Sequence, residues 1–311
     1  MLDVETFLTR LYVLVDDCVK ELRRQQLVTA PRVGRPGRLS VSEVLTLALF
    51  SQWGQFPSER AFYRYAQRHL RPAFPALPAR SQLNRAIRAH LAWLTHLGPM
   101  LAAQLGAATA VYEVLDSTGL PVRNAPRRGS SWLAGHANVG HCTRLGWYYG
   151  FHAVTCVTPE GVLTGTGLAP ASANDHRLAD TFLRARCGAH PGLPGVGRPA
   201  DGYYIADTGF DRPATPQVWQ QEYGVQMVSM PYRNQRRWPR ALRRWLAGLR
   251  QIVETVHHRL LHTFGQALRR PHALAGAQAR WAAAVALHNA CCWLNRHFHR
   301  PWLAVADLLA W

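Results

Sequence analysis

The chain has 311 residues, and 48% of them are hydrophobic, which is enough apolar surface for one large globular domain or two smaller ones and excludes a disordered protein. Lysine and arginine together number 36 against 18 acidic residues, which gives a formal net charge of +18 at pH 7. Since the basic residues are spread along the chain, this charge favours a polyanionic partner, of which nucleic acid is the commonest.

The six cysteines have no C-x-x-C spacing, which argues against a zinc ribbon or a thioredoxin-like site. No segment approaches 18 uninterrupted apolar residues, and the first residues lack a basic, apolar secretory signal. We therefore expect no membrane role and a reducing, cytoplasmic location, associated with the nucleoid if the partner is DNA.

Residues 1–109 have helical periodicity throughout. Ser40 and Glu43 form a predicted capping box ahead of an apolar run, Ser58 opens a second helix, and Ser81 opens a third. The third helix places Arg85 and Arg88 opposite its apolar face. A short helical unit with these side chains and Arg80 on its last helix is consistent with a helix-turn-helix DNA-binding region, and equally with an ordinary solvated face.

The pattern changes to strands after residue 109. The run A-V-Y-E-V-L-D-S-T predicts a strand that ends at Asp116, before a turn-prone Ser-Thr-Gly. Two further strands, within 146–157 and 161–168, are joined by T-P-E-G and predict a hairpin.

Beyond the hairpin the sequence predicts a helix over 175–185 and then the strand G-Y-Y-I-A, which runs into Asp207 and a Thr-Gly turn. A further short strand follows near Met227. From Arg240 onward the chain is helical again, and Glu254 interrupts the apolar face of that helix.

Each acid has a plain explanation when taken alone. Asp116 and Asp207 are suited to capping turns, and Glu254 is suited to pairing with Arg250 or His258 on its own helix. Taken together they favour a site, because strand, hairpin, helix, strand and acid-bearing helix is the order of a ribonuclease H-like mixed sheet. Three clustered carboxylates repel one another unless hard divalent cations lie between them, which predicts a two-metal Mg²⁺ or Mn²⁺ site for phosphodiester chemistry.

Four motifs carry a family resemblance: D-S-T at 116–118, G-W-Y-Y-G-F-H at 146–152, A-D-T-G-F at 206–210 and L-R-Q-I-V-E-T at 249–255. With the helical segment before them, they resemble the D-D-E transposases of bacterial insertion sequences, most closely the group numbered nine eight two. The resemblance covers most of residues 40–265.

The resemblance implies DNA transposition, with Asp116, Asp207 and Glu254 as catalytic metal ligands. It also implies that Arg250, four residues before the glutamate, contacts phosphate near the site. The chain departs from the broader signature at Leu261, where a lysine is expected, and Arg259 is the nearest basic substitute. It departs again at Thr208, where related chains often have a basic residue, and in the N-D-H-R order of residues 174–177.

Other polar residues leave alternatives open. The densest basic run contains Arg233, Arg236 and Arg237, and we expect these side chains to contact phosphate, the alternative being a solvated loop. The histidines near Glu254 suggest a zinc site, which is the weaker interpretation because neighbouring helical side chains point apart.

The sequence thus predicts an α/β protein in two parts: a helical, DNA-binding region over 1–109 and a ribonuclease H-like catalytic domain with C-terminal helices over 110–311. Its expected partners are double-stranded DNA, at the element ends and at the target, and a second copy of the chain, since pairing two ends needs at least a dimer. The rival functions are a DNA-binding, repressor-like protein without catalysis and a plain metal-dependent nuclease of the same fold.

Overall fold

The structure is a computed structural model that describes residues 1–28, 37–124, 133, 135–187, 202–210, 215–229, 238–268 and 270–311. These residues form two compact units: a helical unit of Met1–Leu101 with Leu260–Trp311, and a sheet unit of Ala102–Arg259. The functional division expected after residue 109 stays a prediction, and the segment from Leu260 onward is part of the helical unit.

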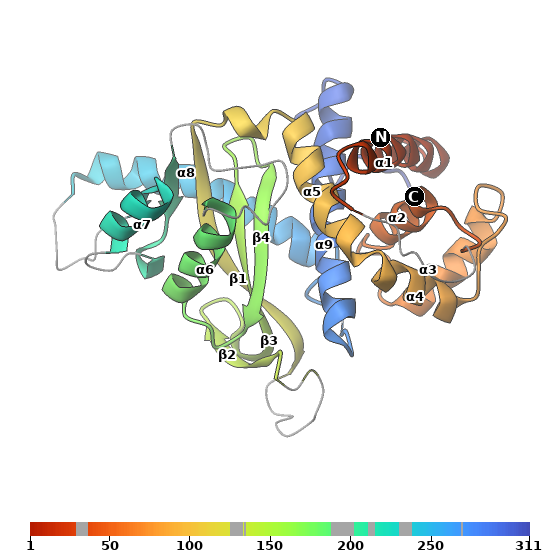
Figure 1. The fold of residues 1–311 in the computed structure, drawn as a ribbon, viewed down its shortest axis with the longest axis horizontal. Coiled ribbons are helices and arrows are strands. Elements are labelled where there is room, and N and C mark those ends of the chain that lie inside the picture. Colours follow the sequence, from red (N-terminus) through yellow and green to blue (C-terminus); the bar gives the residue numbers. More distant parts are fainter. Residues whose placement is uncertain are drawn as a thin grey trace. The chain divides into compact units, whose positions relative to one another are not determined.

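Two helices of the helical unit begin at the capping residues that the sequence predicts (Figure 1). The unit contains α1 (Val4–Arg24), α2 (Val41–Phe50), α3 (Glu59–Tyr65) with a π-helical extension to Leu70, α4 (Arg80–Ala89), most of α5 (Leu91–Gln104) and α9 (Leu274–His297). The predicted capping box is confirmed, since the Ser40 hydroxyl accepts from the Glu43 amide at 3.2 Å and the Glu43 carboxylate accepts from the Ser40 amide at 2.7 Å. Ser58 caps α3 as expected.

One helix of this unit begins and ends elsewhere than expected. Ala79, not Ser81, is the N-cap of α4, and the Gln82 side chain accepts from its amide at 3.2 Å. The helix ends at Ala89 and α5 begins at Leu91, so His90 lies between two separate helices. Helix propensities did not predict this break. His90 is the C-cap of α4, and its ring Nδ1 lies 2.7 Å from the Ala86 carbonyl.

The sheet unit contains six strands within the described residues (Figure 1). They are β1 (Tyr112–Asn124), β2 (Asn138–Cys142), β3 (Gly146–Val157), β4 (Leu163–Pro170), β5 (Tyr203–Ala206) and β6 (Gln226–Ser229). Antiparallel pairs join β1 to β3 and β3 to β4, while β1, β5 and β6 are parallel. The resulting order, β4-β3-β1-β5-β6, confirms the expected ribonuclease H-like fold, with β2 added against the first residues of β3.

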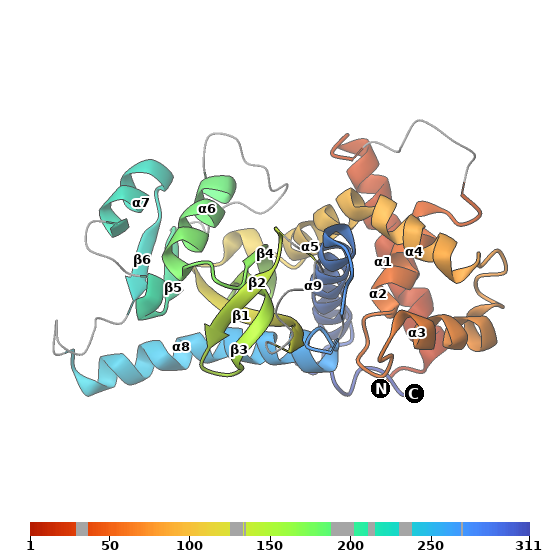
Figure 2. The same cartoon turned by 90° about the horizontal axis from the view of Figure 1, so that it is seen from below.

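Helices cover both faces of this sheet (Figure 2). One face packs against α6 (Asp175–Cys187) and α7 (Thr215–Tyr223) through a buried cluster that includes Leu115, Phe182 and Trp219. The other face contacts α8 (Arg240–His258), which runs beneath β1, β3 and β5. Since side chains alternate along a strand, consecutive residues of β1 serve opposite helices.

Two strand predictions need comment. The hairpin of β3 and β4 is confirmed, with Gly161 at φ +88° in its turn. The expected end of β1 at Asp116 is wrong, because the strand continues to Asn124. Its partner β3 pairs Asp116 with Thr155 and stays in register as far as Pro121 with Gly150, so the turn-prone Ser-Thr-Gly is held extended. Within the described ranges, no helix combines the length and apolarity needed to cross a membrane.

Candidate active site

Two of the predicted acids lie at the same level of neighbouring strands. The parallel pairing of β1 and β5 ends with Leu115 opposite Ala206. Asp116 is the next residue after Leu115, and Asp207 is the next residue after Ala206. Asp207 follows the last residue of β5, as predicted, and a short 3₁₀ turn at Thr208–Phe210 follows it. The carboxyl ends of adjacent parallel strands therefore bring together two acids that are far apart in sequence.

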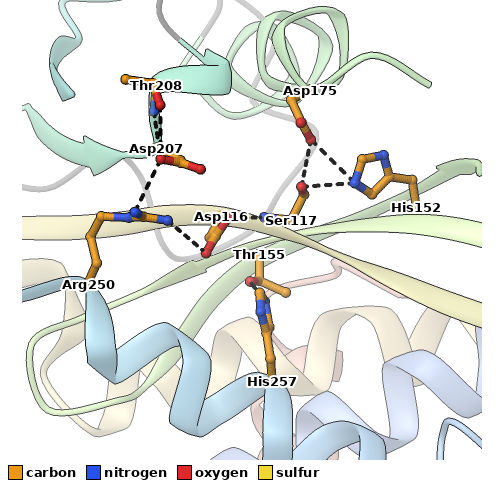
Figure 3. A network of polar contacts seen from close by, with 9 residues as sticks. All are labelled: Asp116, Ser117, His152, Thr155, Asp175, Asp207, Thr208, Arg250 and His257. Carbon is orange, nitrogen blue, oxygen red and sulfur yellow. Dashed lines mark hydrogen bonds and ion pairs between the residues drawn. The ribbon is translucent and has the colours of Figure 1, made fainter. Parts of the chain in front are cut away.

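Arg250 connects these two carboxylates from α8 (Figure 3). Its Nη1 donates to Asp207 Oδ1 at 3.3 Å and its Nη2 to Asp116 Oδ2 at 3.4 Å. Both contacts are longer than the 2.7–2.9 Å typical of a strong charge-assisted hydrogen bond. The Arg250 Nε is buried and has no hydrogen-bond partner among the described residues. The guanidinium thus makes only long contacts with the two carboxylates, and its Nε donor is not used among the described residues.

The buried position of Asp116 disfavours the charged form of its carboxyl group. Its side chain is only 15% exposed, whereas that of Asp207 is 48% exposed. Burial raises the pKa of Asp116 to about 6, even though Arg250 and the Ser117 amide act in the other direction, and the charges of Asp207 and Asp175 add to the rise. A further cation would relieve this imbalance.

Glu254 lies one turn beyond Arg250 on α8, with its side chain exposed. Among the described residues, no three His, Cys, Asp or Glu side chains gather closely enough to hold an ion together. The placement of Glu254 as a third ligand therefore stays a prediction, and the two aspartates are the acids that the structure brings together.

The chemistry of this pair still fits a divalent metal ion. Carboxylate oxygens are the hard donors that Mg²⁺ and Mn²⁺ prefer, and Mg²⁺ is commonly held by one or two carboxylates together with water and substrate phosphates. Burial raises the pKa of Asp116 despite the nearby Arg250 guanidinium, so a cation bound beside it would favour the charged carboxylate. Asp116 and Asp207 are thus the residues that would hold such an ion.

Three polar residues beside Asp116 were missed by sequence reasoning. Ser117, His152 and Asp175 contact one another on the face of the sheet that α6 covers (Figure 3). The only sequence signals were the N-D-H-R run at the start of α6 and the histidine that ends G-F-H on β3. Neither signal shows that the two meet Ser117, since this depends on the pairing of β1 with β3.

The histidines of α8 do not form a metal centre with their neighbours among the described residues. His257 is buried, and its Nε2 lies 2.7 Å from the Thr155 hydroxyl. Burial, together with the charge of Arg144, lowers the pKa of His257 to about 3, so the ring is neutral near pH 7. His257 thus joins α8 to Thr155 of β3, the residue that pairs with Asp116 across the two strands.

The predicted DNA-binding arginines have different environments. Arg80, Arg85 and Arg88 are all exposed on α4. The residues expected in the densest basic run, Arg233, Arg236 and Arg237, lie outside the described residues.

The structure places Leu261, the first departure from the broader transposase signature, in a buried position. Leu261 is buried in the helical unit, so this position presents no side chain for phosphate contact. Arg259, which we expected to substitute for the missing lysine, is half-buried.

Comparison with known families adds an independent finding. Residues 114–290, more than half of the chain, match the transposase DDE domain family. The chain belongs to this family. No curated protein and no solved structure matches the sequence of this chain.

Membership of the DDE transposase family places the chain in the nuclease and transposase class of enzymes, whose members bind DNA and generally use divalent metal ions. The matched segment of the DDE domain begins two residues before Asp116 and contains Asp207, Arg250 and Glu254. It therefore includes all of the candidate acids.

Proposed function

We propose that the chain is the transposase of an insertion sequence of the group numbered nine eight two. The observation that supports this most directly is the meeting of Asp116 and Asp207 at one guanidinium, on adjacent parallel strands of a ribonuclease H-like sheet. The family match supports the enzyme class, and the four quoted motifs support the group.

The proposed reaction has two steps. In the first, water attacks the phosphodiester at the element end, the bond from phosphorus to the 3′ oxygen breaks, and a 3′-hydroxyl is released. In the second, that hydroxyl attacks a target phosphodiester, so that one phosphorus–oxygen bond forms as another breaks and a target 3′-hydroxyl leaves. A divalent cation, Mg²⁺ or Mn²⁺, supplies activation of the attacking oxygen and charge stabilisation at the leaving oxygen when it is bound.

The residues of the chain have separate roles in this proposal. Asp116 and Asp207 hold the metal ions, with Glu254 as the third ligand. Arg250 exchanges its loose contacts with the carboxylates for the phosphate of the substrate.

The DNA contacts are also part of the proposal. The helical region holds the element ends through Arg80, Arg85 and Arg88, and a second set of arginines contacts phosphate. This second set is Arg233, Arg236, Arg237 and Arg259. Two copies of the chain pair the two ends.

The test is strand cleavage of DNA that carries the ends of the encoding element, in Mg²⁺ or Mn²⁺. We expect the wild type to cut, EDTA to stop it, and Asp207→Asn to lose at least ~100-fold in rate while it still binds the ends. Glu222→Gln is a matched control, because it neutralises an exposed acid on α7, and it should cut like the wild type.

Other outcomes separate the rivals. Binding of the ends without cleavage in any metal would mean a DNA-binding protein without catalysis. Cleavage without joining of the 3′-hydroxyl to target DNA would mean a plain nuclease.

A further inference from the structure

Ser117, His152 and Asp175 form a closed hydrogen-bonded cluster beside the acids (Figure 3). The Ser117 hydroxyl donates to Asp175 Oδ1 at 2.6 Å, and His152 Nε2 lies 2.9 Å from that hydroxyl and 3.3 Å from the same carboxylate oxygen. On the other side of the ring, His152 Nδ1 lies 3.0 Å from the Ala173 carbonyl. The cluster therefore joins β1, β3, the segment before α6 and the first residue of α6.

This geometry is not that of a Ser-His-Asp hydrolase. In such a triad the carboxylate holds Nδ1 and the serine contacts Nε2. Here Asp175 and Ser117 share Nε2, and Nδ1 faces a backbone carbonyl. The cluster therefore lacks the contact between a carboxylate and Nδ1 that orients the histidine of a triad, and we assign Ser117 no nucleophilic role.

The main chain of Ser117 has a second contact that leads to the acids. Its amide donates to Asp116 Oδ1 at 2.8 Å, while Asp116 Oδ2 faces Arg250. The side chain of Ser117 points to the opposite face of the sheet, toward Asp175, because side chains alternate along β1. Fixing that side chain therefore fixes the amide that orients the Asp116 carboxylate.

The cluster also reaches the turn after the second acid. A Cβ atom placed on Gly209 would lie 3.4 Å from Asp175 Oδ2, in van der Waals contact. Gly209 is two residues beyond Asp207, in the 3₁₀ turn. Asp175 therefore bonds the residue after Asp116 and lies beside the turn that follows Asp207.

We propose that Ser117, His152 and Asp175 are positioning residues for the metal site, a role that rests on the proposed function. Asp175 and His152 hold the Ser117 hydroxyl, and the Ser117 amide then holds Asp116 in the orientation that binds the ion. Loss of an outer partner of this kind commonly weakens metal binding by ~10–100-fold.

The test measures Mn²⁺ binding by the full chain, using electron paramagnetic resonance of the free ion, and does not depend on turnover. We expect Ser117→Ala and Asp175→Asn each to weaken Mn²⁺ binding by roughly ten-fold. Ser117→Thr retains the hydroxyl and should bind Mn²⁺ within about two-fold of the wild type. The matched control, Ser172→Ala, removes an exposed hydroxyl that bonds only Asn138 in the described structure, and should leave Mn²⁺ binding unchanged.

The outcomes separate this inference from the function on which it rests. If Asp116→Asn loses Mn²⁺ binding while Ser117→Ala and Asp175→Asn bind like the wild type, the positioning role is wrong and the metal site stands. If the wild type binds Mn²⁺ no better than Asp116→Asn, the metal site itself is wrong. Should Ser117→Ala not fold, Asp175→Asn decides the question, since it keeps Ser117 and removes the carboxylate charge that holds the Ser117 hydroxyl.

Discussion

Asp116 is nearly buried on β1, with Asp207, Asp175 and Arg250 as its charged neighbours. Its pKa in the folded chain, about 6, is above the ordinary value of 3.8. The folded state therefore binds a proton more tightly than the unfolded state between these two pH values. The contribution of Asp116 to the free energy of unfolding therefore falls as the pH rises from about 4 to about 6, and then stays constant at higher pH.

This linkage predicts that Asp116→Asn stabilises the metal-free protein. A shift of about two pKa units corresponds to ~3 kcal/mol, and the lost contact with Arg250 removes part of the gain, so we expect an increase of about 1–3 kcal/mol at pH 7.5. Urea unfolding in EDTA at pH 4, 6 and 7.5 measures it. The variant should lose the fall in stability between pH 4 and 6, and a variant less stable than the wild type at pH 7.5 would contradict the account.

At the scale of elements, a buried ion pair fastens α6 to β1. Arg186 donates to both carboxylate oxygens of Glu113, with Nη2 at 2.8 Å from Oε1, and the two side chains are 0% and 1% exposed. The guanidinium also lies over the rings of Phe182 and Tyr204. Because neither charge reaches water, each depends on the other for compensation.

Neutralising one member of this pair should weaken the whole sheet unit. We expect Glu113→Gln to lower the free energy of unfolding by ~3–5 kcal/mol, because it removes the negative charge that lies against the buried Arg186 guanidinium. Chemical denaturation measures the loss, with the exposed Glu222→Gln as a control that should stay within about 0.5 kcal/mol of the wild type. A loss below about 1 kcal/mol for Glu113→Gln would show that Arg186 finds another partner or reaches water.

The elements also show how far sequence reasoning reached. Asp207 was placed correctly because a short apolar run followed by Thr-Gly is a local signal. The continuation of β1 past Asp116 was not local, since it depends on pairing with β3. The cluster of Ser117 and Asp175 joins positions 58 residues apart, and no spacing rule connects them.

At the scale of the whole molecule, turn and capping signals predicted much of the order of strands and helices, but β2, α7 and the break between α4 and α5 were not predicted. The acid pair was predictable from the same order, since adjacent parallel strands end at the same edge. The orientation of the Glu254 side chain was less predictable, because the direction of a side chain at the margin of a helix face depends on packing. The net charge of +18 is consistent with DNA as the partner, and the family match supports that class.

The central claim is that Asp116 and Asp207 hold the metal ion that cuts DNA. The most direct measurement is cleavage of element-end DNA by Asp207→Cys in Mg²⁺ and in Mn²⁺. A thiolate is a poor ligand for Mg²⁺ and a better one for softer ions, so the account predicts almost no cleavage in Mg²⁺ and clear recovery in Mn²⁺. Cleavage in Mg²⁺ at the wild-type rate, or DNA binding without cleavage in either metal, would contradict it.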